Sequence, residues 1–85
     1  MYALERNGPI VARRMRDVAP PDAYAVVTCS YNGGNRVWAH RTLGAAYRRL
    51  ASVCAGKLNA RDDFAAAIVM PDQRVVTYFE ARGML

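Results

Sequence analysis

The chain has 85 residues, which is enough for one domain with a single modest core. Hydrophobic residues make up 53% of it and charged residues 22%, a balance that is typical of ordered globular proteins and excludes a disordered chain. No apolar run approaches the roughly 18 residues that a membrane span needs, and the first residues lack the apolar segment of a signal peptide. We therefore expect a single cytoplasmic domain with no membrane segment.

The net charge is +5, and almost all of the basic residues are arginines. Lys57 is the only lysine among the 12 basic residues. The planar guanidinium suits phosphates, carboxylates and aromatic faces better than an ammonium does, although a GC-rich coding sequence also favours Arg and Ala. The charge therefore indicates attraction to acidic partners, without by itself predicting nucleic-acid binding.

Residues 9–18 are expected to form the first helix, because Pro9 suits a first helical position, where its missing N–H would have no partner. Residues 2–6 are compatible with a short leading strand, and Asn7-Gly8 is a turn dipeptide that would instead place a hairpin here. Apolar residues recur with helical spacing after Pro9, which favours the helix. The expected buried face consists of Val11, Met15 and Val18.

The centre of the chain predicts a β-hairpin formed by residues 24–31 and 36–40 around a Gly-rich loop. The apolar pattern fits a three-residue loop at positions 32–34 whose last residue is left-handed, because this register pairs Cys29 with Val37. A one-residue slip would turn the apolar side chains to the opposite face. The apolar face is expected to consist of Val27, Cys29, Val37 and Ala39.

The other face of this hairpin carries the candidate partner-binding site, a row formed by Arg36, Trp38 and His40. A tryptophan beside an arginine is typical of an interface anchor, since it combines a large rigid area with a planar donor. The alternative is that a helix covers this face, in which case Trp38 is a core residue. His40 alone is more typical of a structural hydrogen bond than of catalysis.

Residues 42–55 form the second expected helix, with Thr42 as its N-cap and Gly56 suited to close it. Residues 57–63 are expected to form a surface connection. The apolar face of the helix is continuous when projected at helical spacing, and Arg48 and Arg49 lie on the opposite side. Its members are Leu43, Ala46, Tyr47, Leu50, Val53 and Cys54.

The last part of the chain predicts a second hairpin, formed by residues 64–70 and 74–81 around a type I turn at positions 71–73. The expected fold class is therefore α+β with the order α-β-β-α-β-β. A single antiparallel sheet of four to five strands, the fifth being the short leading strand, would carry two helices packed on one face. With that leading strand, a ferredoxin-like arrangement is the alternative.

The sequence gives no catalytic, metal or cofactor-binding constellation. Cys29 lies on the opposite face of its strand from His40, and Cys54 faces the core, which disfavours a Cys–His nucleophile pair. No disulfide is expected without a secretory signal, and three Cys and His residues are too few for a structural zinc site. The pair Asp62-Asp63 lacks the spaced ligands of a calcium loop. We therefore expect no enzyme, no metal and no cofactor.

The arrangement of hairpin 24–40, helix 42–55 and hairpin 64–81 resembles the small phage-encoded anti-CRISPR proteins. The resemblance is one of architecture and covers most of the chain. Those proteins share no common motif, so it assigns a role to no residue. It implies an inhibitor in the bacterial host cytoplasm that occupies a surface of a CRISPR effector complex. Many such proteins mimic DNA with acidic surfaces, whereas a charge of +5 favours contact with an acidic protein face or with nucleic acid.

The leading hypothesis is a non-catalytic binding protein or inhibitor with a protein partner or a nucleoprotein complex as its target. The first alternative is a basic nucleic-acid-binding module, in which arginines of both helices form one surface that contacts phosphates. The second alternative is a small dimeric regulator, so both a monomer and a homodimer are considered. The alternative basic surface consists of Arg13, Arg14, Arg16, Arg48 and Arg49.

Overall fold

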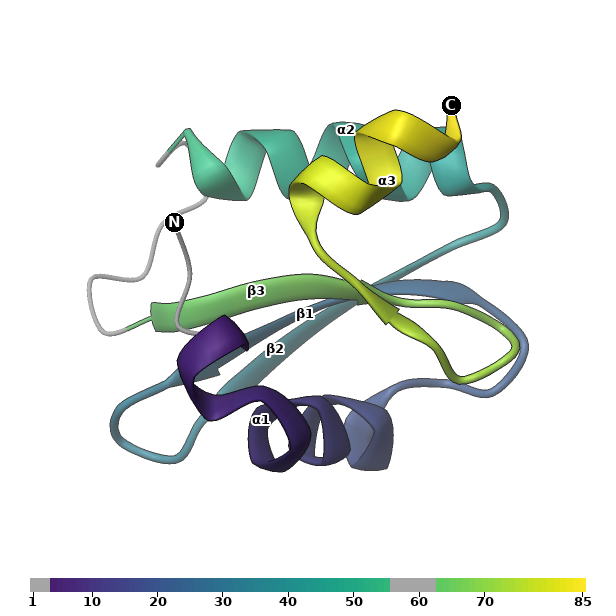
Figure 1. The fold of residues 1–85 in the computed structure, drawn as a ribbon. Helices are drawn as coiled ribbons and strands as arrows, with labels where there is room; N and C mark the ends of the chain where they lie inside the picture. The colour runs from purple at the N-terminus through teal and green to yellow at the C-terminus, as the bar shows by residue number, and fades with distance from the viewer. Residues whose placement is uncertain (1–3, 56–62) are drawn as a thin grey trace.

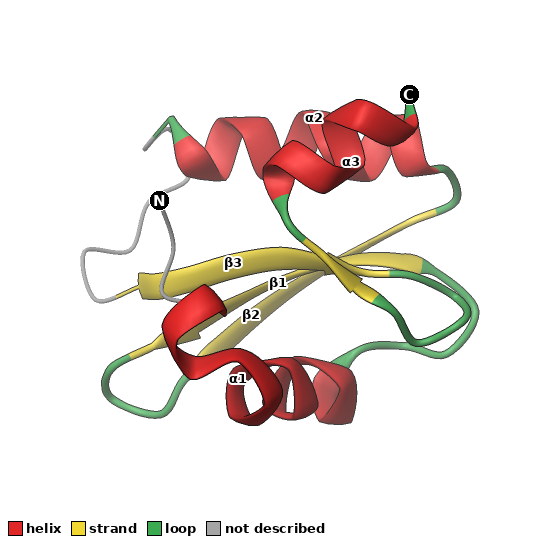
Figure 2. Cartoon of the chain, viewed as in Figure 1, coloured by secondary structure: helices red, strands yellow, loops and turns green. Residues whose placement is uncertain are grey.

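The computed structural model describes residues 4–55 and 63–85, which form three helices and one antiparallel sheet (Figures 1 and 2). The four strands are arranged in the order β2-β1-β3-β4, and each neighbouring pair is antiparallel. The α+β class and the four-stranded antiparallel sheet expected from the sequence are confirmed. No described helix has the length and apolar character of a membrane span. The elements are α1 (Leu4–Val18), β1 (Tyr24–Ser30), β2 (Asn35–His40), α2 (Leu43–Cys54), β3 (Asp63–Val69), β4 (Val75–Val76) and α3 (Tyr78–Met84).

The helices cover both faces of the sheet, so the expectation that they pack on one face is wrong. Figure 1 shows α1 on one side of the sheet and α2 with α3 on the other. Every residue of β1 after Tyr24 is buried, as are the described side chains of β3. Strands that are apolar on both faces need a layer on each side to exclude water, which is the physical reason for the three layers.

Two separate hydrophobic clusters result from this arrangement. On the α1 side, Val11 and Met15 pack against small residues of β1 and β3, including Ala25 and Ala67. On the other side, Leu50 of α2 packs among the alternate residues of the same strands. The side chains that complete the second cluster are Val26, Ala46, Val53, Ala66, Ile68, Met70, Val76 and Ala81.

Helix α1 begins earlier than the sequence pattern indicates. Residues 4–6, expected in a leading strand, belong to the helix, and residues 2 and 3 lie outside the described part of the chain. Pro9 is inside the helix, and Figure 1 shows the first turn at an angle to the turns that follow. A bend is expected there, because Pro cannot donate to the preceding turn. Val18 ends the helix and is 38% exposed, so its expected burial is wrong.

The loop of the central hairpin has three residues as expected, but it starts one residue earlier. Ser30 N donates to Gly34 O at 2.9 Å, and Gly33 N donates to Ser30 O at 3.1 Å. Gly33 has a φ of 90°, the conformation that was expected for Gly34. The pairing consequently shifts by two residues, so that Val37 lies opposite Val27 instead of Cys29. A shift of two keeps every side chain on its expected face.

Strand β2 lies at the edge of the sheet, and its side chains are less covered than those of β1. Helix α1 packs against β1, β3 and β4. Val37 and Ala39 pair with residues of the α1-side cluster but do not belong to it, and Val37 is 37% exposed. The expectation that these two residues belong to the core is therefore wrong.

The second hairpin is shorter than expected, because its second strand soon gives way to a helix. Strand β3 and the turn at positions 71–73 are confirmed, whereas a strand over residues 74–81 is wrong. Thr77 Oγ1 accepts from Glu80 N at 3.2 Å, and Thr77 N donates to Glu80 Oε1 at 2.9 Å. This capping box satisfies two otherwise unpaired N–H groups and starts α3.

Both hairpins turn through the same type of loop. In the second, Met70 N donates to Arg74 O at 2.8 Å and Gln73 N donates to Met70 O at 2.9 Å, as in the first loop. The last loop residue is left-handed in each case, with φ values of 90° at Gly33 and 74° at Gln73. In the left-handed backbone conformation a Cβ atom clashes with the backbone, which destabilises the folded chain by about 1–2 kcal/mol. Gln73 therefore carries a strain that Gly33 avoids.

Replacing Gln73 with Gly should raise the free energy of unfolding by about 1 kcal/mol and the melting temperature by about 4–8 °C. The gain is smaller than the full strain, because glycine also gives the unfolded chain more freedom. Thermal unfolding followed by circular dichroism measures it. Gly33→Ala is the matched control and should lower the melting temperature, since no atom within 4 Å would contact its Cβ and only the backbone strain acts. A Gln73→Gly protein that melts lower would contradict the account.

Candidate functional site

The row formed by Arg36, Trp38 and His40 lies on the face of the sheet that α2 covers. All three residues are half-buried. Trp38 packs against the cluster around Leu50, so the helix covers the ring in part, as the alternative considered from the sequence required. This face is therefore buried in part and exposed in part, and the Trp38 side chain is itself partly in the core and partly at the surface.

Two arginines from different elements lie over the Trp38 ring. The Cζ atom of Arg36 is 4.9 Å from the ring centroid, and that of Arg49 is 5.6 Å from it. A guanidinium at this distance is attracted to the negative face of the indole ring. Arg49 belongs to α2, so the structure brings one of the helix arginines to the expected row.

His40 ends β2 and contacts the same arginine. Arg49 Nε donates to His40 Nε2 at 3.4 Å, which requires an unprotonated Nε2 and hence a neutral ring. Burial lowers the pKa of His40 below its ordinary value of 6.5, and the charges of Arg49 and then Arg48 lower it further. His40 is therefore an acceptor in this structure.

A shallow, open hollow of about 310 Å³ lies between the end of β2 and the outer side of α2. Arg48 is exposed beside it, and a Cβ added at Gly44 would lie 3.7 Å from Arg48 Nη1. The first turn of α2 contains no acidic residue that would offset the positive end of the helix dipole. We call this site the cationic hollow; it is lined by His40, Ala45, Arg48, Arg49 and Ser52.

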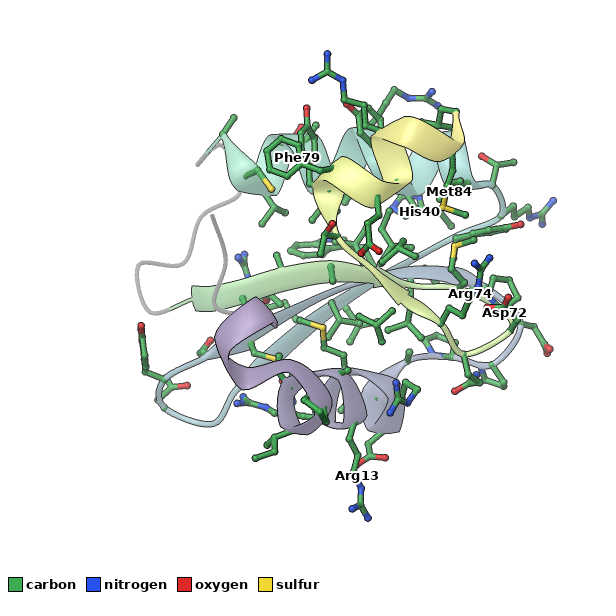
Figure 3. All side chains as sticks on the ribbon, in the orientation of Figure 1. Arg13, His40, Asp72, Arg74, Phe79 and Met84 are labelled. Carbon is green, nitrogen blue, oxygen red and sulfur yellow. The ribbon has the colours of Figure 1, made fainter. Side chains whose placement is uncertain are left out.

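The arginines of α1 do not extend this surface. Arg13 points away from the sheet on the far side of α1, and His40 lies on the opposite side of the sheet (Figure 3). Arg14 Nε donates to Asn35 Oδ1 at 3.0 Å, so this arginine is used within the fold. The single basic surface considered from the sequence required both helices on one face, and that condition is not met.

Sequence reasoning identified His40, Arg48 and Arg49 as separate candidates, placed Ser52 on the same side of the helix as the two arginines without a role, and did not consider Ala45. Positions 45, 48, 49 and 52 follow the spacing of one helical stripe, a signal that is readable from the sequence. Thr42 caps the helix two residues after His40, as expected, and its Oγ1 accepts from Ala45 N at 3.1 Å. The short connection brings the end of the strand beside the first turns of the helix.

The chemistry available at this site is that of cations, an aromatic ring and a hydroxyl group. Among residues 4–55 and 63–85, no three side chains of His, Cys, Asp or Glu are grouped so that they could hold a metal ion. Comparison of the chain with protein-family models, curated proteins and solved structures finds no match in any of the three. The described groups are suited to binding an acidic partner through charge and hydrogen bonds.

Lowering the pH from about 8 to about 5 should destabilise the fold through His40. Above its ordinary pKa of 6.5, the ring is neutral in both the folded and the unfolded chain. As the pH falls through this value the unfolded chain takes up the proton first, because the pKa of His40 is lowered in the folded chain. The loss of stability is complete below the folded pKa.

Urea unfolding at several pH values measures this dependence. His40 is the only histidine of the chain, so His40→Gln should flatten the curve between about pH 5 and about pH 8. A wild-type protein whose stability rises as the pH falls through this range would contradict the assignment of a neutral His40.

Proposed function

We propose that this chain is a non-catalytic binding protein that covers an acidic surface of a protein partner with the cationic hollow and the edge beside it. The observation that carries the proposal is the convergence of Arg48, Arg49 and His40 around an open hollow. Rigid, well-packed arginines are frequent anchors at protein interfaces. The Trp38 ring packs against two arginines, Arg36 and Arg49.

The distribution of the arginines favours a protein partner over nucleic acid. The exposed Arg13 of α1 and Arg48 of α2 lie on opposite sides of the sheet, so a duplex that binds against one side does not contact both. The Trp38 ring has two guanidinium groups over it and α2 beside it, which leaves little of it for a nucleic-acid base to stack on. Phosphate binding could therefore not use the arginines of α1 and α2 together.

The likeness to anti-CRISPR proteins gives the proposal a specific form. In that form the partner is a CRISPR effector complex, and the chain acts by steric occlusion of an acidic protein face. The positive charge is opposite to that of a DNA mimic and is compatible with an acidic protein face as the target. Inhibition of target-DNA binding by such a complex, measured with and without the protein, tests this form.

Arg48→Glu should weaken partner capture at least about tenfold, because it removes an exposed anchor and places a like charge against an acidic surface. Arg13→Glu is the matched control, since it makes the same charge change at an exposed helix position on the other side of the sheet. Affinity capture from a bacterial lysate, with and without nuclease, measures both variants. Capture that nuclease abolishes, or that both variants weaken equally, would overturn the proposal.

A further inference from the structure

The cationic hollow combines donors from one helix with an acceptor at the end of a strand. Arg49 is directed toward β2, where it contacts both the Trp38 ring and His40. The guanidinium of the neighbouring Arg48 lies instead near Gly44, one turn earlier on the helix. None of the residues that line the hollow is acidic. Two positive charges are thus held on one side of the helix with no lining residue to neutralise them.

We propose that the cationic hollow is the binding site for a single carboxylate group, presented by an acidic side chain of the protein partner. This inference rests on the proposed function and names the chemical group that it would recognise. A guanidinium fork matches the two oxygens of a carboxylate, which favours Arg48 as the principal donor. Ser52 lines the hollow one turn further along α2 and offers a hydroxyl donor.

A carboxylate fits this site better than a phosphate does. Arg49 is already directed to Trp38 and His40, so that Arg48 is the arginine exposed to an incoming group. The two parallel N–H groups of one guanidinium fork match the two oxygens of a carboxylate, whereas a phosphate dianion presents more acceptors than one fork can pair. The shallow, open shape of the hollow also suits the end of a side chain on a facing surface.

Binding of the carboxylate should be linked to protonation of His40. The charged groups that act on this ring are Arg48 and Arg49 of α2, and its partner across the strands is Tyr24 of β1. A bound carboxylate offsets the repulsion from the two arginines, so it should raise the pKa of His40. A proton is then taken up on binding, and the affinity should increase as the pH falls.

The test is an NMR titration of the full chain with acetyl-tetraglutamate amide, with acetyl-tetraglutamine amide as the neutral probe and with inorganic phosphate at matched ionic strength. We expect the acidic peptide to shift the signals of His40 and Ser52 and to raise the measured pKa of His40 by about one pH unit. A neutral peptide that causes equal shifts, or no shift with either anion, would overturn the proposal. Tighter binding of phosphate would overturn the choice of a carboxylate.

Two variants make the test specific to the cationic hollow. Arg48→Gln should reduce the affinity for the acidic peptide at least fivefold, while Arg13→Gln should leave it unchanged. Gly44→Glu places a carboxylate one turn before Arg48, where it should compete for the guanidinium. It should therefore lower the affinity for the acidic peptide while the protein stays folded. Equal binding by all three variants would refute the site. Peptide binding without partner capture would instead refute the proposed function alone.

Discussion

Replacing Met15 with Ala is expected to lower the free energy of unfolding by about 3 kcal/mol and the melting temperature by roughly 12–24 °C. Met15 is 0% exposed, and among the described side chains of α1 it is buried with Val11 against this face of the sheet. The residues beneath it include Ala25 and Ala67, which are too short to fill the cavity that truncation leaves. An 85-residue domain has only about 4–13 kcal/mol of stability in total, so the loss is large.

Urea unfolding of the two proteins measures the difference, and an unchanged dependence on urea concentration would show that the unfolding remains two-state. Arg13→Ala is the matched control on the same helix, because Arg13 is exposed and should change the stability by less than about 0.5 kcal/mol. A loss at Met15 as small as that at Arg13 would show that α1 does not cover the sheet.

The two-sided sheet was indicated in the sequence but was not inferred from it. Residues 25–29 and 65–70 are apolar or small at nearly every position, which is typical of strands that are buried on both faces. The alternation of β2 suggested a sheet with one solvated face, but β2 is an edge strand in which the apolar Val37 and Ala39 are the exposed residues. The short length of these apolar runs also limits the inference, because such a run is compatible with a sheet that is covered on one face or on both.

The register of the central hairpin shows where local reasoning ends. The apolar pattern correctly fixed the face of each side chain and the length of the loop. It could not decide between Gly33 and Gly34 as the left-handed residue, because both are glycines and either choice preserves the faces. The observed choice agrees with a long-range contact, the hydrogen bond from Arg14 Nη2 to Gly34 O at 2.8 Å.

The C-terminal helix was missed because β propensity and capping gave opposite indications. Residues 75–79 are rich in β-branched and aromatic residues, which favours a strand. Thr77 and Glu80 have the spacing of a capping box, which favours a helix start. The helix then packs on α2, where the Tyr47 and Tyr78 rings stack at 5.1 Å and their hydroxyl oxygens lie 3.0 Å apart. This tertiary contact stabilises α3 in addition to the capping box.

The candidate site could be predicted residue by residue but not as a unit. The row on β2 followed from alternation, and Arg48 and Arg49 followed from helical projection. Their meeting depends on the crossing of α2 over β2, which sets Arg49 5.6 Å from the Trp38 centroid. The position of that crossing cannot be predicted from helical or strand periodicity, because it results from how Leu50 packs on the sheet.

Replacing Arg14 with Lys is expected to lower the free energy of unfolding by about 2 kcal/mol, although the charge is retained. Arg14 Nε donates to Asn35 Oδ1 at 3.0 Å, and Nη2 donates to Ser30 O at 3.3 Å and to Gly34 O at 2.8 Å. A single guanidinium thus joins α1 to both sides of the hairpin loop. An ammonium has no planar fork with which to reach these three acceptors together.

Arg16→Lys is the matched control, because Arg16 is a half-buried arginine of the same helix, and its change should stay within about 0.5 kcal/mol. Urea unfolding gives both values. Amide hydrogen exchange adds a local readout, since Ser30 N and Gly33 N should exchange faster only in Arg14→Lys, where the loop carbonyls lose their partner. Equal stability of the two variants, with unchanged exchange in the loop, would mean that the guanidinium is not what fixes the hairpin register. Faster exchange confined to this loop would identify Arg14 as a structural residue, which removes it from the arginines available to a partner.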